Sequence, residues 1–424
     1  MIAFKAFRAG AAALLIVVGA GSAFAADLQP TAPERAGMSS ERLKRMDDFI
    51  HAYVDKGRTP GVVTLIARHG KVVHVDAYGP AEVGGRKIAQ DDIFRMYSMT
   101  KPITSVALLM LYEEGRFQLT DPLGMYLPAF NDVKVFVGTG PNGQMRFDSP
   151  HRAITIEDVF RHTAGFSYGI GIGGANPVDA LYQKEDFFSK DLTNLINRLP
   201  KLPLLYQPGE RWVYSVSHDV QAALVEHFSG MKFDDFVRTR IFEPLGMKDS
   251  MFAIPAAKAA RVPALYAPMP DGKIAKATGS LAEGYGQHVF GGLSISTSAA
   301  DYARFAQMLL DKGELNGTRL LSPKTVALMT VNHLPDAAMQ SGGLSIGAET
   351  GTGYGLGVSV LLDPAKRGNL GSAGEFGWSG AAATHVLIDP KEDLVALYCT
   401  QLLGGDFALR AEFATLLYQA IVGD

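Results

Sequence analysis

Cysteine is almost absent from the sequence, since Cys399 is the only one among 424 residues. A single cysteine forms neither an internal disulfide nor a cysteine-built metal site, so the fold must be stable without either. Because Cys399 lies in an apolar, strand-forming segment, we expect it to be an inert core residue. The ten histidines show no H-E-x-x-H or similar metal-ligand spacing, and we therefore expect no metal and no cofactor.

The sequence also lacks an excess of one charge, because 40 basic side chains stand against 43 acidic ones. Proteins that bind nucleic acids carry a basic surface, so this balance argues against a nucleic-acid partner. Long apolar runs are missing as well. The apolar run over residues 11–18 is shorter than the roughly 20 residues that a membrane span needs, and no later segment is long and apolar enough. We therefore expect no stable membrane anchor.

The first 25 residues have the pattern of a cleavable signal peptide. Lys5 and Arg8 form a basic start, the apolar run follows, and Ala23-Phe24-Ala25 matches the small-residue cleavage pattern. No cysteine follows the run, which excludes a lipid anchor on a modified cysteine. We predict cleavage after Ala25 and a periplasmic or secreted protein made of residues 26–424.

Strand-forming runs lie near both ends of the chain. Residues 62–67 and 72–75 are joined across His69-Gly70 as in a hairpin, and residues 384–388 and 394–400 form a second pair. Such runs at both ends predict one sheet to which both ends contribute strands. We expect this α/β part to cover about residues 35–100 and 340–424.

The middle of the chain, about residues 101–339, has a helical pattern and is expected to be a helical part inserted in the α/β part. Apolar residues recur there at i, i+3, i+4 and i+7, the spacing of an amphipathic helix. The length of the chain and its 47% apolar fraction fit a globular protein with about two such parts. Expected helix N-caps across the chain are Ser39 or Ser40, Thr155, Ser298 and Ser322.

The segment Ser98-Met99-Thr100-Lys101 places a hydroxyl and an amine three residues apart, on one face of a helix. Proline is tolerated only near a helix start, so Pro102 indicates that the helix begins close to Ser98. A serine at that position lies in the positive field of the helix N-terminus. Burial lowers the pKa of a lysine, which allows Lys101 to act as a base. Ser98 is therefore a candidate nucleophile.

Two other serines have motifs that compete with this assignment. Ser229-Gly230-Met231-Lys232 repeats the spacing, but it follows a helix end, where the field has the wrong sign for an oxyanion. Gly165-Phe166-Ser167-Tyr168-Gly169 matches the G-x-S-x-G of lipases and esterases, which requires a turn from a strand into a helix. Here a helix precedes the motif and a loop follows it. We expect Ser167 to be a helix-end or loop serine.

Two later segments hold further candidates. Tyr214 precedes a predicted helix and is placed to relay a proton, although a tyrosine in such a turn often only anchors a loop. Trp378-Ser379-Gly380 comes just before a predicted strand, where the backbone N–H of Ala381 would face that of Ser98 and complete an oxyanion hole. For His162 and His218 we expect hydrogen-bonded structural roles.

Taken in order, the Ser-x-x-Lys, the tyrosine and the Trp-x-Gly resemble the class C β-lactamase and penicillin-binding protein superfamily. The resemblance is strongest to its esterase branch, the family VIII carboxylesterases. Residues 162–165, 208–210, 244–247 and 377–380 are similar to that group too, and the resemblance covers about residues 35–421. It implies an α/β fold with an antiparallel sheet flanked by helices, an inserted helical domain, and an active site between them.

The resemblance also implies the roles of the candidate residues. Ser98 is the nucleophile, Lys101 and Tyr214 are the base and the proton relay in an order left open, and the oxyanion side is lined by Trp378, Ser379, Gly380 and Ala381. The β-lactamases of the group have asparagine where this chain has Val216 and lysine where it has Trp378. Both differences remove polar groups that hold a β-lactam.

We therefore expect an esterase that acts on short- to medium-chain acyl esters, with a small-molecule ester or a β-lactam-like substrate as its partner. One alternative is a β-lactamase or a D-alanyl-D-alanine peptidase-like enzyme that acts on cell-wall peptides. The other is a binding protein on the same scaffold that lacks catalytic turnover.

Overall fold

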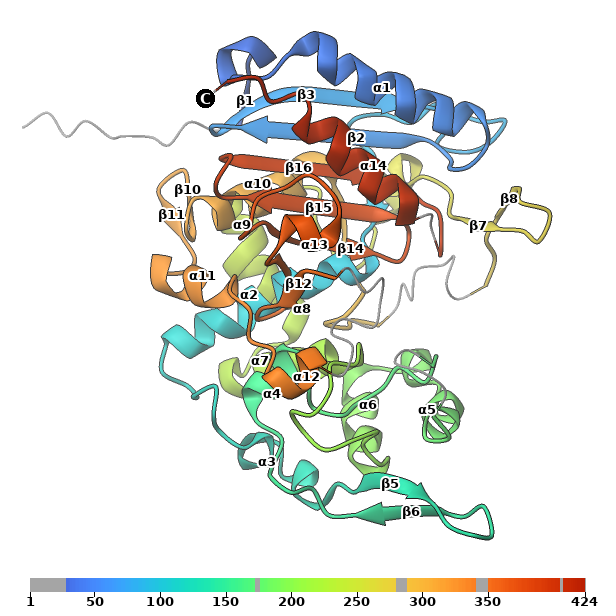
Figure 1. Ribbon diagram of the computed structural model, residues 1–424, viewed down its shortest axis with the longest axis vertical. Coiled ribbons are helices and arrows are strands. Elements are labelled where there is room, and N and C mark those ends of the chain that lie inside the picture. Colours follow the sequence, from blue (N-terminus) through green and yellow to red (C-terminus); the bar gives the residue numbers. More distant parts are fainter. Residues whose placement is uncertain (1–27, 172–175, 280–287, 341–349, 405–406, 424) are drawn as a thin grey trace, which may run out of the picture.

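The computed structural model describes residues 28–171, 176–279, 288–340, 350–404 and 407–423 (Figure 1). The predicted signal peptide lies outside these ranges. No helix within them is both long and apolar enough to cross a membrane.

The main sheet has eight strands and draws them from both ends of the chain (Figure 1). The strands from the two chain ends meet at the antiparallel pairing of β2 with β16, in which Leu65 is the register partner of Leu397. Among the described strands of this sheet, only the pairing of β1 with β3 is parallel. In spatial order the strands are β1 (Gln29–Pro30), β3 (Lys71–Tyr78), β2 (Val62–Arg68), β16 (Leu394–Cys399), β15 (Thr384–Asp389), β14 (Phe376–Gly380), β13 (Ser359–Leu361) and β12 (Thr352–Tyr354).

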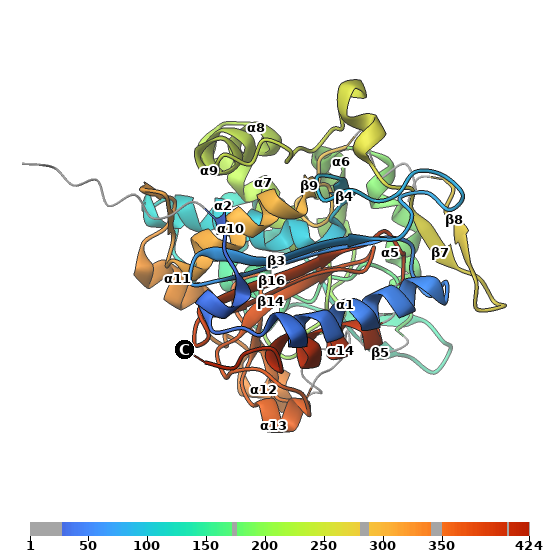
Figure 2. The same cartoon turned by 90° about the horizontal axis from the view of Figure 1, so that it is seen from above.

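Helices cover both faces of this sheet, as Figure 2 shows. On one face lie α1 (Ser40–Asp55) and α14 (Phe407–Tyr418); on the other lie α2 (Thr100–Glu113) and α10 (Ala299–Leu310). All seven residues of β2 are therefore buried, and alternate side chains enter different cores, Val62 on the α1 side and Val63 on the α2 side. The N-caps predicted for α1 and α10 are confirmed, because Ser39 and Ser298 accept hydrogen bonds from the first turns.

Along the chain, a mainly helical part comes between the two groups of sheet strands, and in space it extends away from the sheet (Figure 1). The antiparallel sheet flanked by helices, with helices inserted between its two halves, is the fold class that the sequence predicts. The other helices are α3 (Leu123–Tyr126), α4 (Ile156–Phe160), α5 (Asp179–Glu185), α6 (Leu192–Arg198), α7 (Ser217–Ser229), α8 (Phe233–Val237), α9 (Glu243–Leu245), α11 (Pro323–Met329), α12 (Asp336–Gln340) and α13 (Pro364–Arg367).

Within the part of the chain that the structure describes, four short strand pairs lie outside the main sheet. One of them, β4 with β9, leads directly into the segment that carries Ser98. The pairs are β4 (Ile93–Arg95) with β9 (Ser296–Ser298), β5 (Val135–Thr139) with β6 (Met145–Asp148), β7 (Tyr266–Pro268) with β8 (Ile274–Lys276), and β10 (Glu314–Leu315) with β11 (Thr318–Arg319).

Candidate active site

Ser98 lies where the chain turns from β4 into α2. A single 3₁₀ turn, Tyr97–Met99, precedes α2, so the serine stands at the helix start as predicted. Tyr97 has a φ of +45°, in the left-handed region that a bulky residue rarely adopts. Such strain persists only where the surrounding structure holds it, and it is often found at functional sites. The Ser98 side chain is half-buried, while its neighbours Tyr97 and Met99 are buried.

Lys101 lies one helical turn beyond Ser98 and is completely buried. Its Nζ is 3.1 Å from Ser98 Oγ and donates a 2.8 Å hydrogen bond to the carbonyl oxygen of Gly292. Burial lowers the pKa of Lys101 to about 7, and the carboxylate of Asp219 partly opposes this shift. A neutral amine has a lone pair, so near neutral pH Lys101 can accept the proton of Ser98.

Tyr214 lies in the loop before α7 and is buried beside Lys101. The ring centroid of Tyr214 is 4.5 Å from Lys101 Nζ, and its hydroxyl interacts with Ser98. Trp378 Nε1 donates a 3.3 Å hydrogen bond to the same hydroxyl. Burial raises the pKa of Tyr214, although both hydrogen bonds act in the opposite direction. Tyr214 therefore stays protonated near neutral pH and can donate a proton.

The end of β14 lies against the segment that carries Ser98. A β-carbon on Gly380 would be 2.2 Å from the carbonyl oxygen of Met96, so only glycine allows this approach. Thr384 Oγ1 also donates to that oxygen, at 3.4 Å. The contact brings the turn that begins at Ala381 next to the start of α2.

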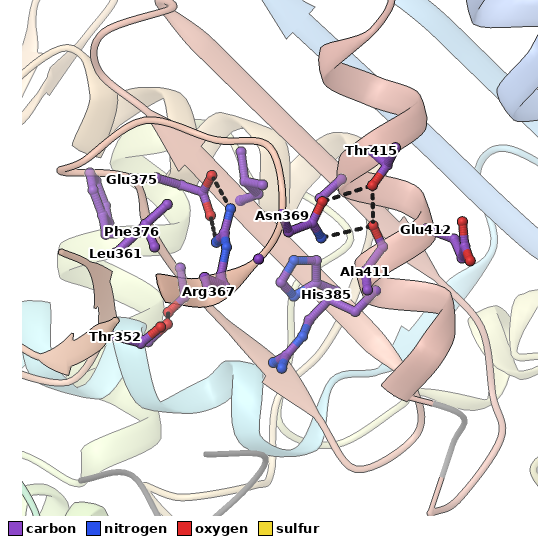
Figure 3. Close-up of a pocket in the computed structure, with 16 residues that line it drawn as sticks. Thr352, Leu361, Arg367, Asn369, Glu375, Phe376, His385, Ala411, Glu412 and Thr415 are labelled. Carbon is purple, nitrogen blue, oxygen red and sulfur yellow. Dashed lines mark hydrogen bonds and ion pairs between the residues drawn. The ribbon is translucent and has the colours of Figure 1, made fainter. Parts of the chain in front are cut away.

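Ser379 lies on the opposite face of β14 from Trp378, as the alternation of a strand requires. Its Oγ is 2.9 Å from His385 Nδ1. His385 lines a pocket of about 280 Å³ between the sheet and α14, shown in Figure 3. In this pocket Arg367 pairs with Glu375, and Asn369 bonds to Thr415. The Ser379 side chain therefore points away from Ser98, and only its backbone remains for the oxyanion side.

The Gly165–Gly169 motif forms a loop, as predicted, and Ser167 stabilises it. Ser167 is buried, donates a hydrogen bond to Asp179, and accepts one of 2.8 Å from Gly169 N. The loop places the ring of Tyr168 5.4 Å from that of Tyr214 and 5.5 Å from Lys101 Nζ. The motif thus contributes Tyr168 to the wall of the site.

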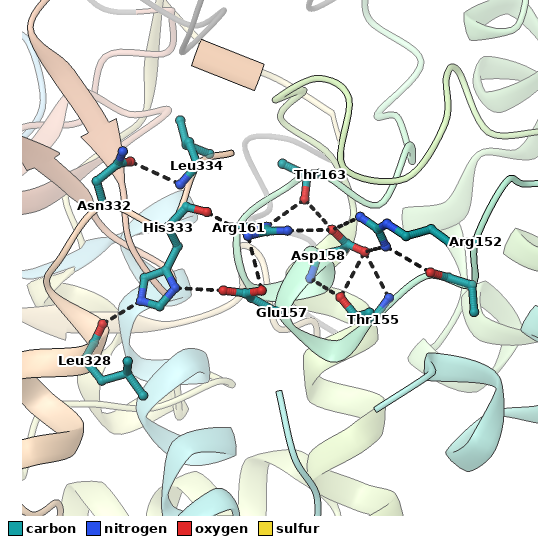
Figure 4. A network of polar contacts seen from close by, with 11 residues as sticks. Arg152, Thr155, Glu157, Asp158, Arg161, Thr163, Leu328, Asn332, His333 and Leu334 are labelled. Carbon is teal, nitrogen blue, oxygen red and sulfur yellow. Dashed lines mark hydrogen bonds and ion pairs between the residues drawn. The ribbon is translucent and has the colours of Figure 1, made fainter. Parts of the chain in front are cut away.

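A polar network, shown in Figure 4, holds the turn before this motif. At its centre is the buried Asp158, which closes the predicted capping box with Thr155 and accepts hydrogen bonds from Arg152, Arg161 and Thr163. Arg161 also donates a 2.7 Å hydrogen bond to the carbonyl oxygen of His333. The network ties α4 to the segment before α12, whose Leu334 packs in one cluster with Tyr214 and Trp378.

The second Ser-x-x-Lys segment lies at the C-terminus of α7, as predicted. Ser229 donates a 2.6 Å hydrogen bond to the carbonyl oxygen of Val225, and Lys232 pairs with Glu226. Cys399 is buried, which raises the pKa of its thiol. Within the described residues, no group of three or more histidine, cysteine or acidic side chains is arranged to hold a metal ion.

Sequence reasoning missed Asp219, a carboxylate in the first turn of α7. It is fully buried and interacts electrostatically with Lys101, although 118 residues separate the two positions. Asp219 follows Tyr214 by five residues, and its place at the start of a predicted helix is the one signal that the sequence offers for it.

The predicted hydrogen bonds of His162 and His218 are present. His162 bonds to Ser215 at 3.3 Å, and His218 bonds to Ser105 at 3.3 Å.

Trp378→Phe is expected to lower kcat/KM for an ester about 2- to 10-fold, because Tyr214 loses a hydrogen bond worth roughly 0.5–1.5 kcal/mol. Steady-state kinetics measure the effect. Trp212→Phe is the matched control, since Trp212 stacks on Tyr214 while its Nε1 bonds to none of the described residues. A larger loss in the Trp212 variant than in the Trp378 variant, with both folded, would contradict the role of the indole N–H.

Comparison with known proteins agrees with this geometry. The Beta-lactamase family model matches residues 46–419, and the chain belongs to this family. It is 30% identical over 398 residues to esterase EstB of Burkholderia gladioli, covering 89% of this chain and 94% of EstB. It is 33% identical over 358 residues to Mycobacterium tuberculosis protein Rv1367c, covering 83% of this chain and 88% of that protein.

The fold is similar to that of simvastatin synthase LovD from Aspergillus terreus. The TM-score is 0.78 at 23% identity, covering 90% of this chain and 98% of LovD. This similarity confirms the fold that the sequence predicts, an antiparallel sheet with flanking helices. Together the family match and the relatives identify the chain as a serine hydrolase of the β-lactamase fold.

Proposed function

We propose that this protein is a carboxylesterase that hydrolyses short- to medium-chain acyl esters through an acyl-enzyme on Ser98. The observation that carries the proposal is the contact set around the serine. Lys101 Nζ is 3.1 Å from Ser98 Oγ, while Tyr214 interacts with the same hydroxyl and accepts a hydrogen bond from Trp378. A nucleophile, a base and a proton donor are thus together, as acyl transfer requires.

The lowered pKa of Lys101 and the raised pKa of Tyr214 support Lys101 as the base in the first step. Neutral Lys101 accepts the proton of Ser98 as Oγ attacks the ester carbonyl carbon. The negative charge on the carbonyl oxygen is stabilised by the N–H groups of Ser98 and Ala381. Tyr214 gives its proton to the leaving alcohol and regains one from Lys101 as the C–O bond breaks.

The second step releases the acid. Water attacks the acyl carbon while the Tyr214–Lys101 pair accepts its proton, and the ester bond to Ser98 breaks as its Oγ is protonated. Atoms balance over the cycle, because one ester and one water give one alcohol and one acid. Besides the ester and the water, these steps use only groups of this chain.

The side chains at positions 216 and 378 support esters over β-lactams. A penicillin carries a carboxylate and an amide that need polar partners. Val216 is fully buried and apolar, and Trp378 directs its one N–H at Tyr214. Neither provides a cation or an amide for the substrate, so a neutral acyl ester fits better.

The alternatives remain a β-lactamase or a peptidase that acts on cell-wall peptides, and a binding protein without turnover. The signal peptide predicted over residues 1–25 would place either of them, or an esterase, outside the cytoplasm. The burial of Lys101 beside Ser98 argues against a binding protein. Burying an amine costs free energy, and a binding protein would gain no catalysis in return.

We expect kcat/KM for nitrophenyl butyrate to exceed that for a penicillin by about ten- to a hundredfold or more. The missing hydrogen bonds to charged groups cost roughly 1.5–3 kcal/mol in the transition state. A chromogenic cephalosporin should lie between the two, because its leaving group eases the chemistry. All three substrates are compared on one enzyme preparation. A penicillin value at or above the ester value would favour the β-lactamase.

A further inference from the structure

The buried carboxylate of Asp219 has no role in the steps above, yet it lies beside the base. Its relative exposure is 0%, and so is that of Lys101. Burying a carboxylate is costly unless it is paired and hydrogen-bonded. Asp219 Oδ1 accepts a 3.0 Å hydrogen bond from Gly292 N, and Oδ2 has no hydrogen-bond partner among the described residues. Burial raises the pKa of Asp219, whereas Lys101 and the backbone N–H groups of residues 292, 219 and 291 lower it and so favour the charged carboxylate.

Gly292 links the two buried groups. Its N–H donates to Asp219 Oδ1 at 3.0 Å, and its carbonyl oxygen accepts from Lys101 Nζ at 2.8 Å. A β-carbon on residue 292 would be 3.2 Å from Asp219 Oδ2 and 3.0 Å from Tyr168 Oη. The carboxylate of Asp219 thus holds the backbone of Gly292, which in turn holds the amine of Lys101. Glycine at position 292 leaves room for the close approach of Asp219 and Tyr168.

We propose that Asp219 is a positioning residue for Lys101, because it holds the amine through Gly292 and supplies the buried negative charge that sets its strength as a base. The proposal deepens the proposed function, since it concerns the same nucleophile and base. Asp219 does not touch the reacting atoms, and its effect passes through Lys101.

The other groups that face Lys101 do not supply this charge. Around the amine are Ser98 on the 3₁₀ turn and Tyr214 and Tyr168 on loops. The ring of His162 contacts that of Tyr214, and the ring of His218 contacts that of His162. Burial lowers the pKa of both histidines well below its usual value, so they stay neutral. Burial raises the pKa of Tyr214, so the phenol also stays neutral. Asp219 is the acidic neighbour that acts on Lys101.

The sign of the effect follows from Coulomb's law. A carboxylate favours the protonated amine, so it keeps the pKa of Lys101 higher than burial alone would. Removing the charge lets that pKa fall further. The free amine then persists at lower pH, but it is a weaker base, so the rate at high pH also falls.

The test is the pH dependence of Ser98 modification by a fluorophosphonate in the full-length protein. For Asp219→Asn we expect the acid limb of the rate to move about one pH unit lower and the plateau to fall several-fold. The Asn side chain keeps an acceptor for Gly292 N and removes only the charge. Asp219→Ser is the second variant should Asn not fold, and it is expected to move the limb in the same direction.

Asp301→Asn is the matched control, because Asp301 is also a buried acid but bonds to Asp249 N and Ser250. Its acid limb should match that of the wild type. A plateau loss in the Asp219 variants with an unmoved limb would show a merely structural role and overturn the proposal. Failure of the ester proposal is separate, since it would appear as labelling of the wild type without ester turnover.

Discussion

Ser98→Ala is expected to lower kcat/KM for nitrophenyl butyrate by a factor on the order of 10⁴ or more, because Ser98 is the aliphatic hydroxyl that bonds to Lys101 within the described residues. The alanine variant should fold like the wild type. Ser98 is half-buried at a helix start, and its hydroxyl contacts Lys101 and Tyr214 rather than a structural partner. Steady-state kinetics, with circular dichroism to verify folding, measure the effect.

Ser229→Ala and Ser167→Ala are the controls for the two competing motifs. Ser229 donates a hydrogen bond to the carbonyl oxygen of Val225 and accepts one from Met231 N, both at the end of α7, so its loss should leave activity near that of the wild type. Ser167 holds Asp179 and Gly169 N, and its loss should lower the free energy of unfolding by about 1–3 kcal/mol. Most activity should remain below the melting temperature. An inactive, folded Ser167→Ala variant would refute the assignment of Ser98.

Lys101→Met is expected to lower kcat roughly 10²- to 10⁴-fold, since the variant keeps the length of the side chain and loses the base. Lys101→Arg should be similarly inactive, because a guanidinium stays protonated and cannot accept the Ser98 proton. Neither variant should lose the binding of a neutral ester, so the effect should appear in kcat. A Lys101→Arg enzyme with near-normal kcat would exclude the amine as the base.

The wild-type activity should also depend on pH in a defined direction. The pKa of Lys101 is lowered to about 7, and only the neutral amine is a base. The value of kcat/KM should therefore rise as the pH increases through about 7 and stay high until Tyr214 begins to ionise. Because the pKa of Tyr214 is raised, that loss lies well above neutral pH. An acid limb near pH 4.5 would point to a carboxylate base instead.

Local patterns predicted much of this fold. The capping box of Thr155 with Asp158, the hairpin of β2 and β3, and the start of α2 near Ser98 depend on neighbouring residues, and the structure confirms them. The last helix is less well predicted. Its apolar residues in the sequence predict a helix that reaches Ile421, whereas α14 ends at Tyr418 and Ile421 forms a bridge with Met38. Tertiary pairing therefore limits that helix.

The parts of the site that sequence did not predict arise from contacts between distant segments. Gly292 follows Lys101 by 191 residues, and no local pattern marks the pairing of its backbone with Asp219 and Lys101. The orientation of Ser379, by contrast, follows from a local rule, because neighbouring residues of a strand such as Trp378 and Ser379 point to opposite faces of the sheet. The short strands β12 and β13 were missed because three-residue strands carry too little pattern.

The most direct test of the account is peptide mapping of the wild-type protein after labelling with a fluorophosphonate. Trypsin does not cut before proline, so Lys101-Pro102 stays intact and Ser98 lies in peptide 96–116, whereas Ser167 lies in peptide 162–184. We predict one adduct per chain, on Ser98, and its loss in Ser98→Ala. An adduct on Ser167, or an unlabelled but folded chain, would contradict the central claim that Ser98 is the nucleophile of a serine hydrolase.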